Sequence, residues 1–216
     1  MIDPLSRLAR LRLGTSDAHA RIESVPALAR LLAPDLTPAE YVAVLRHMHG
    51  FLSVVEPDIA AAVADIPPAA ALLDGTRPRA LAEDLAWFGV PSQPLDRAPP
   101  ALSGAAAALG ALYVIEGSGL GGRVIARHLA ASLGVAPGTG GSFYGGPTAE
   151  AARLRWQRLC ALLDPAAPVD SRIGGPIDDD ALLAGALATF GFLDRWMRGI
   201  EVADLSRPSP SAEVAA

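Results

Sequence analysis

The chain has 216 residues, which is enough for one domain with a sizeable core. Hydrophobic residues make up 51% of it and aromatic residues only 5%, a mixture rich in alanine and leucine that favours packed helices over a β-sandwich. A net charge of −5 argues against general nucleic-acid binding, and a single cysteine, Cys160, excludes both an intramolecular disulfide and a cysteine-rich metal site.

The N-terminal half of the chain is predicted to contain three helices. The first covers 4–24, and its start lacks the apolar core and cleavage site of a signal peptide, so we expect a cytoplasmic protein. The second begins at Thr37, which forms a capping-box sequence with Glu40, and we expect Pro57 to interrupt it before it resumes. The third covers 79–88, after loops marked by Pro67, Pro68, Gly75 and Pro78.

The C-terminal half is predicted to contain three more. These helices cover 102–133, 148–163 and 177–200, with a connector over 95–100, a loop over 138–147 and a Pro/Gly-rich segment over 164–176. The longest apolar window, 105–115, is too short for a membrane span, and we interpret it as part of a buried helix. No segment shows the alternation of a β-strand. We therefore predict an all-α single domain over 1–205 and a disordered tail over 206–216.

Glycines are concentrated inside the long helix predicted over 102–133. Gly117, Gly119, Gly121 and Gly122 follow one another in an otherwise strong helical pattern. Each costs roughly 1 kcal/mol against alanine in a helix interior. Such a cost indicates that backbone must approach something closely, which is either another helix or a flat ligand laid across the glycines.

The first helix carries a histidine at the border of its apolar face. Leu11, Thr15 and Ala18 repeat at helical spacing, and His19 follows directly. A histidine here is either a metal ligand or an ordinary structural residue. The same helix is rich in cations, which form either a solvated face or a patch for anionic ligand groups and an acidic electron donor: Arg7, Arg10, Arg12 and Arg21.

Two segments together identify a family. TSDAHARIE around His19, followed by LYVIEGSGLGG around Gly117, resembles the haem oxygenase family over roughly residues 5–200. The resemblance is closest to the bacterial branch associated with bacteriophytochromes. It implies a helical bundle that holds haem between a proximal helix and a glycine-bent distal helix. It also implies oxidative opening of haem, as substrate and cofactor, to biliverdin, CO and Fe2+.

The resemblance also implies a role for individual residues. His19 would be the proximal iron ligand, and Glu23, one helical turn later, could orient its imidazole. Distal contacts would come from Gly117, Ser118 and Gly121, where Ser118 replaces the aspartate of mammalian members. Haem and its propionates would be bound by Arg12, Thr15, Tyr113 and Gly122. A second propionate has several candidates, which are Arg153, Arg155 and Arg158, with Phe143 in the preceding loop.

Other histidines and other classes of protein fit less well. His47 and His49 point in different directions from one helix, and His128 lies too far along its helix from Gly117 to share an iron. A di-iron protein would need Glu-x-x-His pairs, and the sequence contains none. With no flavin or nicotinamide motif, electrons would come from ferredoxin, flavodoxin or a reductase, and a bacteriophytochrome is a candidate acceptor of biliverdin. The alternative is a non-catalytic haem-binding protein.

Overall fold

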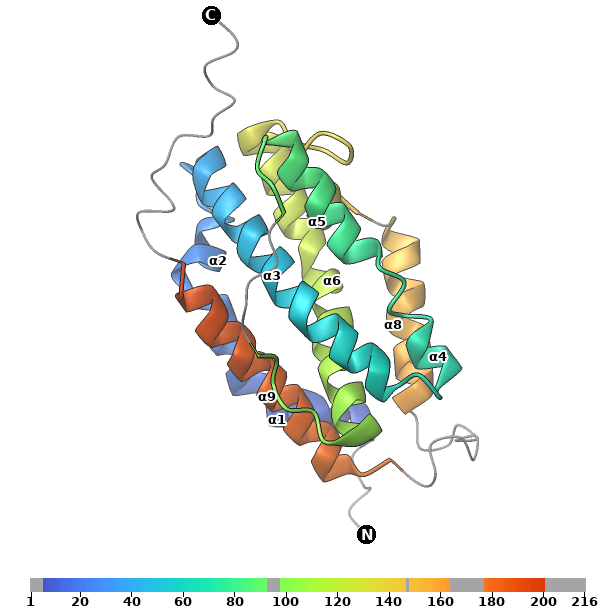
Figure 1. The fold of residues 1–216 in the computed structure, drawn as a ribbon. Coiled ribbons are helices and arrows are strands. Elements are labelled where there is room, and N and C mark those ends of the chain that lie inside the picture. Colours follow the sequence, from blue (N-terminus) through green and yellow to red (C-terminus); the bar gives the residue numbers. More distant parts are fainter. Residues whose placement is uncertain (1–5, 93–97, 147, 164–176, 201–216) are drawn as a thin grey trace, which may run out of the picture.

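The computed structural model describes residues 6–92, 98–146, 148–163 and 177–200, and every regular element in these ranges is a helix (Figure 1). The long helices are α1 (Arg7–Glu23), α3 (Pro38–Ala62), α5 (Thr76–Trp87), α6 (Gly104–Leu133), α8 (Ala149–Leu163) and α9 (Asp179–Arg198). Short helices connect some of them, namely α2 (Pro26–Arg30), α4 (Pro67–Ala70) and α7 (Ser142–Gly145). The predicted all-α class is confirmed. The first residues of the predicted helix 4–24, the first half of the connector 95–100, the segment 164–176 and the tail 206–216 lie outside the described residues.

Local sequence signals fix the starts of the long helices. Ser6 caps α1 by accepting a hydrogen bond from the Ala9 N–H at 3.2 Å. The predicted capping box of α3 is confirmed, because the Glu40 N–H donates to Thr37 Oγ1 at 3.3 Å and the Thr37 N–H donates to Glu40 at 2.8 Å. Asp178 accepts two backbone N–H groups at the start of α9.

Three predicted boundaries are wrong. The interruption at Pro57 does not occur, because α3 continues through it to Ala62. Pro57 is exposed while Val55 and Ile59 beside it are buried, and this burial outweighs the roughly 3 kcal/mol that proline costs inside a helix. α5 begins at Thr76 rather than at 79, since a proline in the first turn loses no helical hydrogen bond. The predicted loops also contain the short helices α4 and α7.

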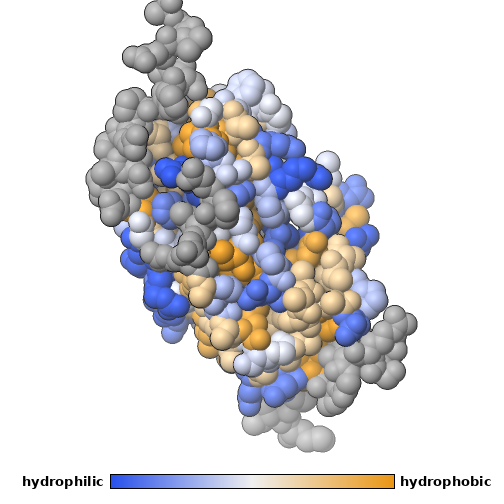
Figure 2. All heavy atoms as spheres, viewed as in Figure 1, coloured by the Kyte–Doolittle hydropathy of each residue, from blue (hydrophilic) through white to orange (hydrophobic). Residues whose placement is uncertain are grey.

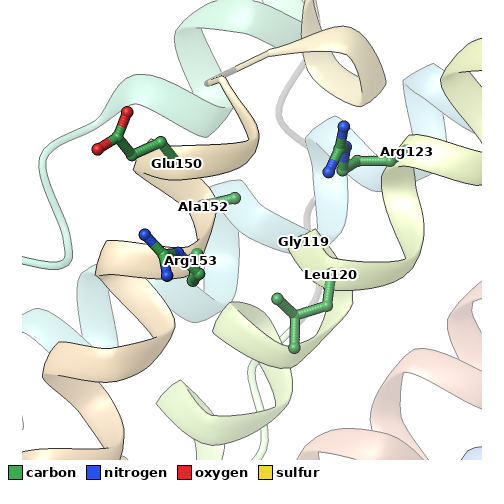
Figure 3. A pocket seen from close by; sticks show the side chains of 6 residues that line it. All are labelled: Gly119, Leu120, Arg123, Glu150, Ala152 and Arg153. Atoms are coloured by element: carbon green, nitrogen blue, oxygen red, sulfur yellow. The ribbon is translucent and has the colours of Figure 1, made fainter.

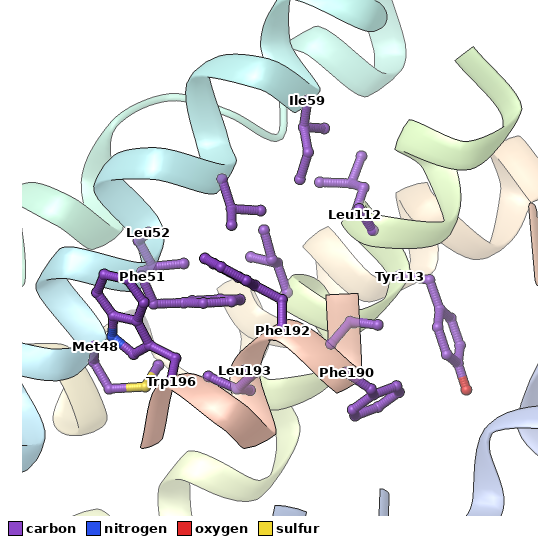
Figure 4. Packing of buried hydrophobic residues seen from close by; sticks show 14 of the residues in the cluster. Met48, Phe51, Leu52, Ile59, Leu112, Tyr113, Phe190, Phe192, Leu193 and Trp196 are labelled. Atoms are coloured by element: carbon purple, nitrogen blue, oxygen red, sulfur yellow. The ribbon is translucent and has the colours of Figure 1, made fainter. Parts of the chain in front are cut away.

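The core is built around α6, which packs against α9, α3, α7 and α8. In Figure 4, aromatic rings from α3 and α9 meet beside α6, with the Phe51 and Phe192 centroids 5.8 Å apart. The Trp196 indole N–H donates to the His47 carbonyl oxygen at 2.7 Å. The predicted apolar window 105–115 is almost entirely buried in this core.

Two glycines outside the glycine-rich segment allow α6 and α9 to touch. A Cβ atom at Gly110 would lie 2.8 Å from the backbone nitrogen of Ala186, and one at Gly185 would lie 2.6 Å from Cα of Ala107. Both distances are shorter than real Cβ contacts allow, so backbone packs against backbone here. No pattern in the sequence predicts this role for the two positions.

The segment before α8 is tied to the rest of the bundle by buried polar groups. The Asp84 carboxylate on α5 is fully buried and accepts the N–H groups of Ser142 at 2.7 Å and Phe143 at 2.8 Å. Burial raises the pKa of Asp84, and the two N–H donors oppose this shift by favouring the charged form. Tyr41 donates to the Gly140 carbonyl oxygen at 3.0 Å. These bonds hold the segment of α7 against α5 and α3.

The outer surface shown in Figure 2 mixes hydrophilic and hydrophobic side chains over this face of the bundle. Several large apolar side chains are exposed, among them Leu120 at 45% and Val124 at 52% on α6. Within the described ranges, none of the helices has the length and apolar character needed to cross a membrane.

Candidate functional site

A pocket of about 370 Å³ lies between α1 and α6. One face of α1 forms one wall, and Tyr113 of α6 forms the other. The residues that line the pocket from α1 are Arg12, Thr15, Ser16, His19, Ala20 and Glu23. The structure therefore brings together five residues that were singled out from the sequence, namely Arg12, Thr15, His19, Glu23 and Tyr113. All but Tyr113 lie on α1, whereas Tyr113 belongs to α6, and only the fold makes it their neighbour.

His19 is oriented by its own helix. Its side chain is 62% exposed, and Nδ1 lies 3.5 Å from Oε1 of Glu23, one turn later. The ring also meets the edge of Phe190 on α9, with centroids 6.0 Å apart at 72°. With Nδ1 facing a carboxylate, Nε2 is the nitrogen through which this imidazole can bind a metal.

Two other polar residues that line the pocket from α1, Thr15 and Arg12, differ in what they can do. The Thr15 hydroxyl is buried and donates to the Leu11 carbonyl oxygen at 2.6 Å, so its proton is used within the helix. Arg12 is exposed. Burial raises the pKa of the Cys160 thiol on α8, and the nearby charge of Arg12 opposes this shift. Arg12 thus brings positive charge to the side of the pocket nearest α8, where it can attract an anionic group of a ligand.

Tyr113 connects the pocket to α8. Tyr113 is buried, with 9% of the residue exposed, and its ring centroid lies 5.7 Å from that of Trp156. Figure 4 shows Tyr113 pointing away from the other rings of the core. Trp156 was not identified from the sequence. The sequence gives little indication that Trp156 belongs to a site, because a single tryptophan in a helix such as α8 is typical of ordinary core packing.

Contacts among the described residues do not require glycine at positions 117, 119, 121 and 122 of α6. A Cβ at Gly117 would lie 3.6 Å from Trp156, and one at Gly122 would lie 3.7 Å from Tyr144, which are ordinary van der Waals distances. At Gly119 and Gly121, no described neighbour would come within 4 Å of a Cβ. Helix packing therefore does not explain these glycines, in contrast to Gly110 and Gly185. Ser118 donates its hydroxyl proton to the Ile115 carbonyl oxygen at 2.7 Å.

A second cavity, of about 610 Å³, borders the same glycine segment on the side of α8. Gly119, Leu120 and Arg123 line it from α6, and Glu150, Ala152 and Arg153 line it from α8 (Figure 3). One of the arginines predicted to meet a propionate, Arg153, therefore lies beside the glycines.

Arg155 has a different role from the one suggested by the sequence. It pairs with the buried Glu116, donating from Nη2 to Oε1 at 3.0 Å and from Nε to Oε2 at 3.3 Å. It also donates to Asp74 Oδ2 at 2.8 Å. A guanidinium that is held by two carboxylates in this way is not available to bind a propionate. Arg158 is exposed, and the Phe143 ring packs against Tyr144, with centroids 4.9 Å apart.

The other histidines contact backbone or neighbouring side chains. His47 Nδ1 lies 3.0 Å from the Ala43 carbonyl oxygen, and His128 Nε2 lies 2.9 Å from that of Ala33. Burial lowers the pKa of His49, which favours its neutral form. None of these three histidines lines the pocket beside His19, in line with the expectation that His47 and His49 are structural or exposed and that His128 does not share the iron.

Comparisons with known proteins place these observations in context. A family model described as heme oxygenase matches residues 5–198. A protein named heme oxygenase from Xanthomonas campestris pv. campestris (strain 8004) is 45% identical over 86 residues, which cover 39% of this chain and 48% of that protein. The match thus spans about half the length of this relative.

Two solved structures share the fold. NO- and CO-bound heme oxygenase from Neisseria meningitidis aligns with a TM-score of 0.69 and 21% identity, covering 96% of this chain and 98% of that one. Heme oxygenase from Leptospira interrogans aligns with a TM-score of 0.66 and 20% identity, covering 90% of this chain and 99% of that one. The similarity extends over almost the whole bundle.

Proposed function

Because the chain belongs to the heme oxygenase family, we propose that it binds haem between α1 and α6 and opens the ring to biliverdin, CO and Fe2+. The reaction consumes O2 and electrons from an external donor, which is a ferredoxin, a flavodoxin or a reductase. We place the protein in the cytoplasm, with a bacteriophytochrome as a candidate acceptor of biliverdin.

The observation that carries this proposal is the open space beside the glycine segment. Gly119 and Gly121 have room for a side chain that they lack, so the chain accepts roughly 1 kcal/mol of helix propensity at each without a packing reason. A flat ligand lying against α6 supplies that reason, because a side chain there would occupy its place. Exposed apolar side chains at Leu120 and Val124 add a surface that a porphyrin would cover.

His19 and Glu23 hold the proximal side. In this assignment His19 binds the iron through Nε2, while Glu23 faces Nδ1 and fixes the orientation of the ring. Bound haem supplies the iron at which O2 is activated. The protein contributes binding, orientation and the shape of the space around the reacting carbon.

Arg12 and Tyr113 suit the polar edge of the ligand. Both line the pocket beside His19, and an arginine can bind a propionate through two hydrogen bonds. Gly117 and Gly121 allow the α6 backbone to lie close to the opposite face of the porphyrin. Ser118, whose hydroxyl is bonded to its own helix, lies next to them. A Cβ at Gly122 would lie at an ordinary distance of 3.7 Å from Tyr144, so packing does not require glycine there, and we keep Gly122 among the residues that contact haem.

A haemin titration followed by reduction in air tests the proposal. We expect a Soret band on binding, and we expect it to decay into a broad absorption of biliverdin when reductant and O2 are present. A Soret band that remains stable under these conditions would support the alternative, a protein that binds haem without degrading it.

The His19→Ala variant tests the axial ligand in the same assay. We expect it to lose the normal ligation spectrum and nearly all turnover, because the structure presents no second histidine in this pocket among its lining residues. Glu23→Gln is the matched control, since it keeps His19 and weakens only the orientation of the ring. An unchanged spectrum and rate in His19→Ala would remove His19 from the site.

A further inference from the structure

Five charged side chains meet where α3, α5, α6 and α8 approach one another, four of them largely buried and Asp74 at the edge with 44% of its side chain exposed. We call them the Glu116 cluster: Glu56, Asp74, Arg77, Glu116 and Arg155. The Glu116 side chain is only 3% exposed, and those of Arg77 and Arg155 are each 17% exposed. Charges are rarely buried to this extent unless they are paired, and each of these has a partner of opposite sign.

Glu116 is held from two sides. Arg155 of α8 reaches both of its carboxylate oxygens, at 3.0 and 3.3 Å, and Arg77 of α5 contacts Oε1 at 2.5 Å. Arg155 is fixed in turn by Asp74 and by the carbonyl oxygen of Leu72. A planar guanidinium that binds a carboxylate through two bonds sets both distance and direction between the two helices.

The residues that follow this pair in the sequence also meet. Gly117 comes directly after Glu116 on α6, and Trp156 comes directly after Arg155 on α8. A Cβ at Gly117 would lie 3.6 Å from the Trp156 ring, and the same ring lies 5.7 Å from that of Tyr113. The ion pair therefore holds α6 and α8 together one residue away from the point where Trp156 borders the proposed haem site.

We propose that the Glu116–Arg155 ion pair is a positioning element that fixes Trp156 against Gly117 and Tyr113, and that Trp156 thereby limits where the porphyrin edge lies. This inference rests on the proposed function. It adds two positioning residues and one specificity-determining residue to the site. A shift of Trp156 changes which meso carbon faces the distal space, and so changes the biliverdin isomers formed.

Stability alone is a poor explanation for the pair. Replacing a buried ion pair by apolar side chains of similar volume is often neutral or stabilising, whereas removing one partner leaves an unpaired buried charge. The geometry, in contrast, depends on both partners. A variant that replaces both residues by apolar ones keeps the contact of Arg77 with Glu56 at 3.5 Å and leaves only Asp74, whose side chain is 44% exposed, without its arginine. It therefore separates positioning from folding.

The experiment compares Glu116→Leu/Arg155→Met with Trp156→Leu and with the combination of all three substitutions. The control is Glu83→Leu/Arg79→Met, which removes an exposed ion pair of α5 whose charged atoms are 3.9 Å apart and whose side chains are 60% and 67% exposed. The readouts are melting of the haem-free protein, haem release to apomyoglobin, the rate of ring opening and the distribution of biliverdin isomers.

We expect the pair variant to fold, to release haem faster and to give an altered isomer distribution that matches that of Trp156→Leu. Its rate of ring opening should fall by on the order of 100-fold, since a displacement of about 1 Å remote from the chemistry has effects of this size. The combined variant should differ little from either parent, because both changes act through the same contact. The α5 control should behave like the wild type.

The inference is overturned if the pair variant keeps the wild-type isomer distribution and haem release, or if its effects add to those of Trp156→Leu. Should the pair variant not fold, Arg155→Lys decides the matter, because it keeps the charge but loses the two-pronged contact, and an unchanged isomer distribution there also overturns the inference. A wild-type protein that bound no haem would refute the proposed function itself, while one that bound haem without degrading it would leave haem release as the readout.

Discussion

Replacing Gly110 by alanine should destabilise the bundle at the crossing of α6 and α9. The new Cβ would lie 2.8 Å from the backbone nitrogen of Ala186 and closer still to the Leu182 carbonyl oxygen. Both are backbone atoms, so no change of rotamer relieves the overlap and α9 must move. Overpacking of a core costs typically about 1–3 kcal/mol, and a backbone overlap belongs at the upper end of this range.

Part of this cost is offset by the helix itself. Alanine is about 1 kcal/mol better than glycine inside a helix, so a cost of about 3 kcal/mol from overpacking leaves a net loss of about 2 kcal/mol. For a chain of this size, each kcal/mol corresponds to roughly 2–4 °C in Tm. We therefore expect the Tm of Gly110→Ala to fall by about 4–8 °C.

Gly119→Ala is the matched control on the same helix. No described atom would come within 4 Å of its Cβ, so only the helix propensity changes, and the free energy of unfolding should rise by up to about 1 kcal/mol. Both variants are measured without ligand, by far-UV circular dichroism on heating and by urea unfolding. If Gly110→Ala melts at or above the wild-type temperature, α6 and α9 do not approach as closely as the structure indicates.

Three other perturbations test the site and the pH dependence. Arg12→Glu should weaken haem binding, because it removes a charge-assisted hydrogen bond to a propionate. Such a bond contributes about 1.5–3 kcal/mol, reduced to about 1 kcal/mol for an exposed arginine. Unchanged haem affinity would remove Arg12 from the site. Gly121→Leu should fold and bind haem but lose ring opening, and a variant that melted much earlier yet turned haem over normally would refute the distal assignment. Arg30 and the cap of α3 lower the pKa of Glu40 from 4.5 to about 2, so this carboxylate stabilises the fold above its unfolded pKa and that contribution disappears as the pH falls from about 4.5 towards 2. Glu40→Gln should flatten this part of the stability–pH curve in urea unfolding, and an equally steep decline in both proteins would contradict the assignment.

Local sequence determined much of the architecture. The capping box at Thr37 and Glu40, the helical spacing around His19 and the glycines of 117–122 are all short-range signals, and the structure contains the corresponding helices. His19 and Glu23 also face each other because residues four apart share a helix face. Such features depend on a few neighbouring residues, so they can be predicted from the chain without knowing its fold.

The tertiary structure decided what these segments do for one another. It showed that packing needs Gly110 and Gly185 while Gly119 and Gly121 face open space, and that Arg155 pairs with Glu116 instead of being available for a propionate. It also kept α3 intact through Pro57, against the local preference of proline. The physical reason is the same in each case. A glycine, an arginine or a proline has a fixed local cost, but its benefit comes from contacts with segments distant in sequence, and no local pattern encodes those contacts.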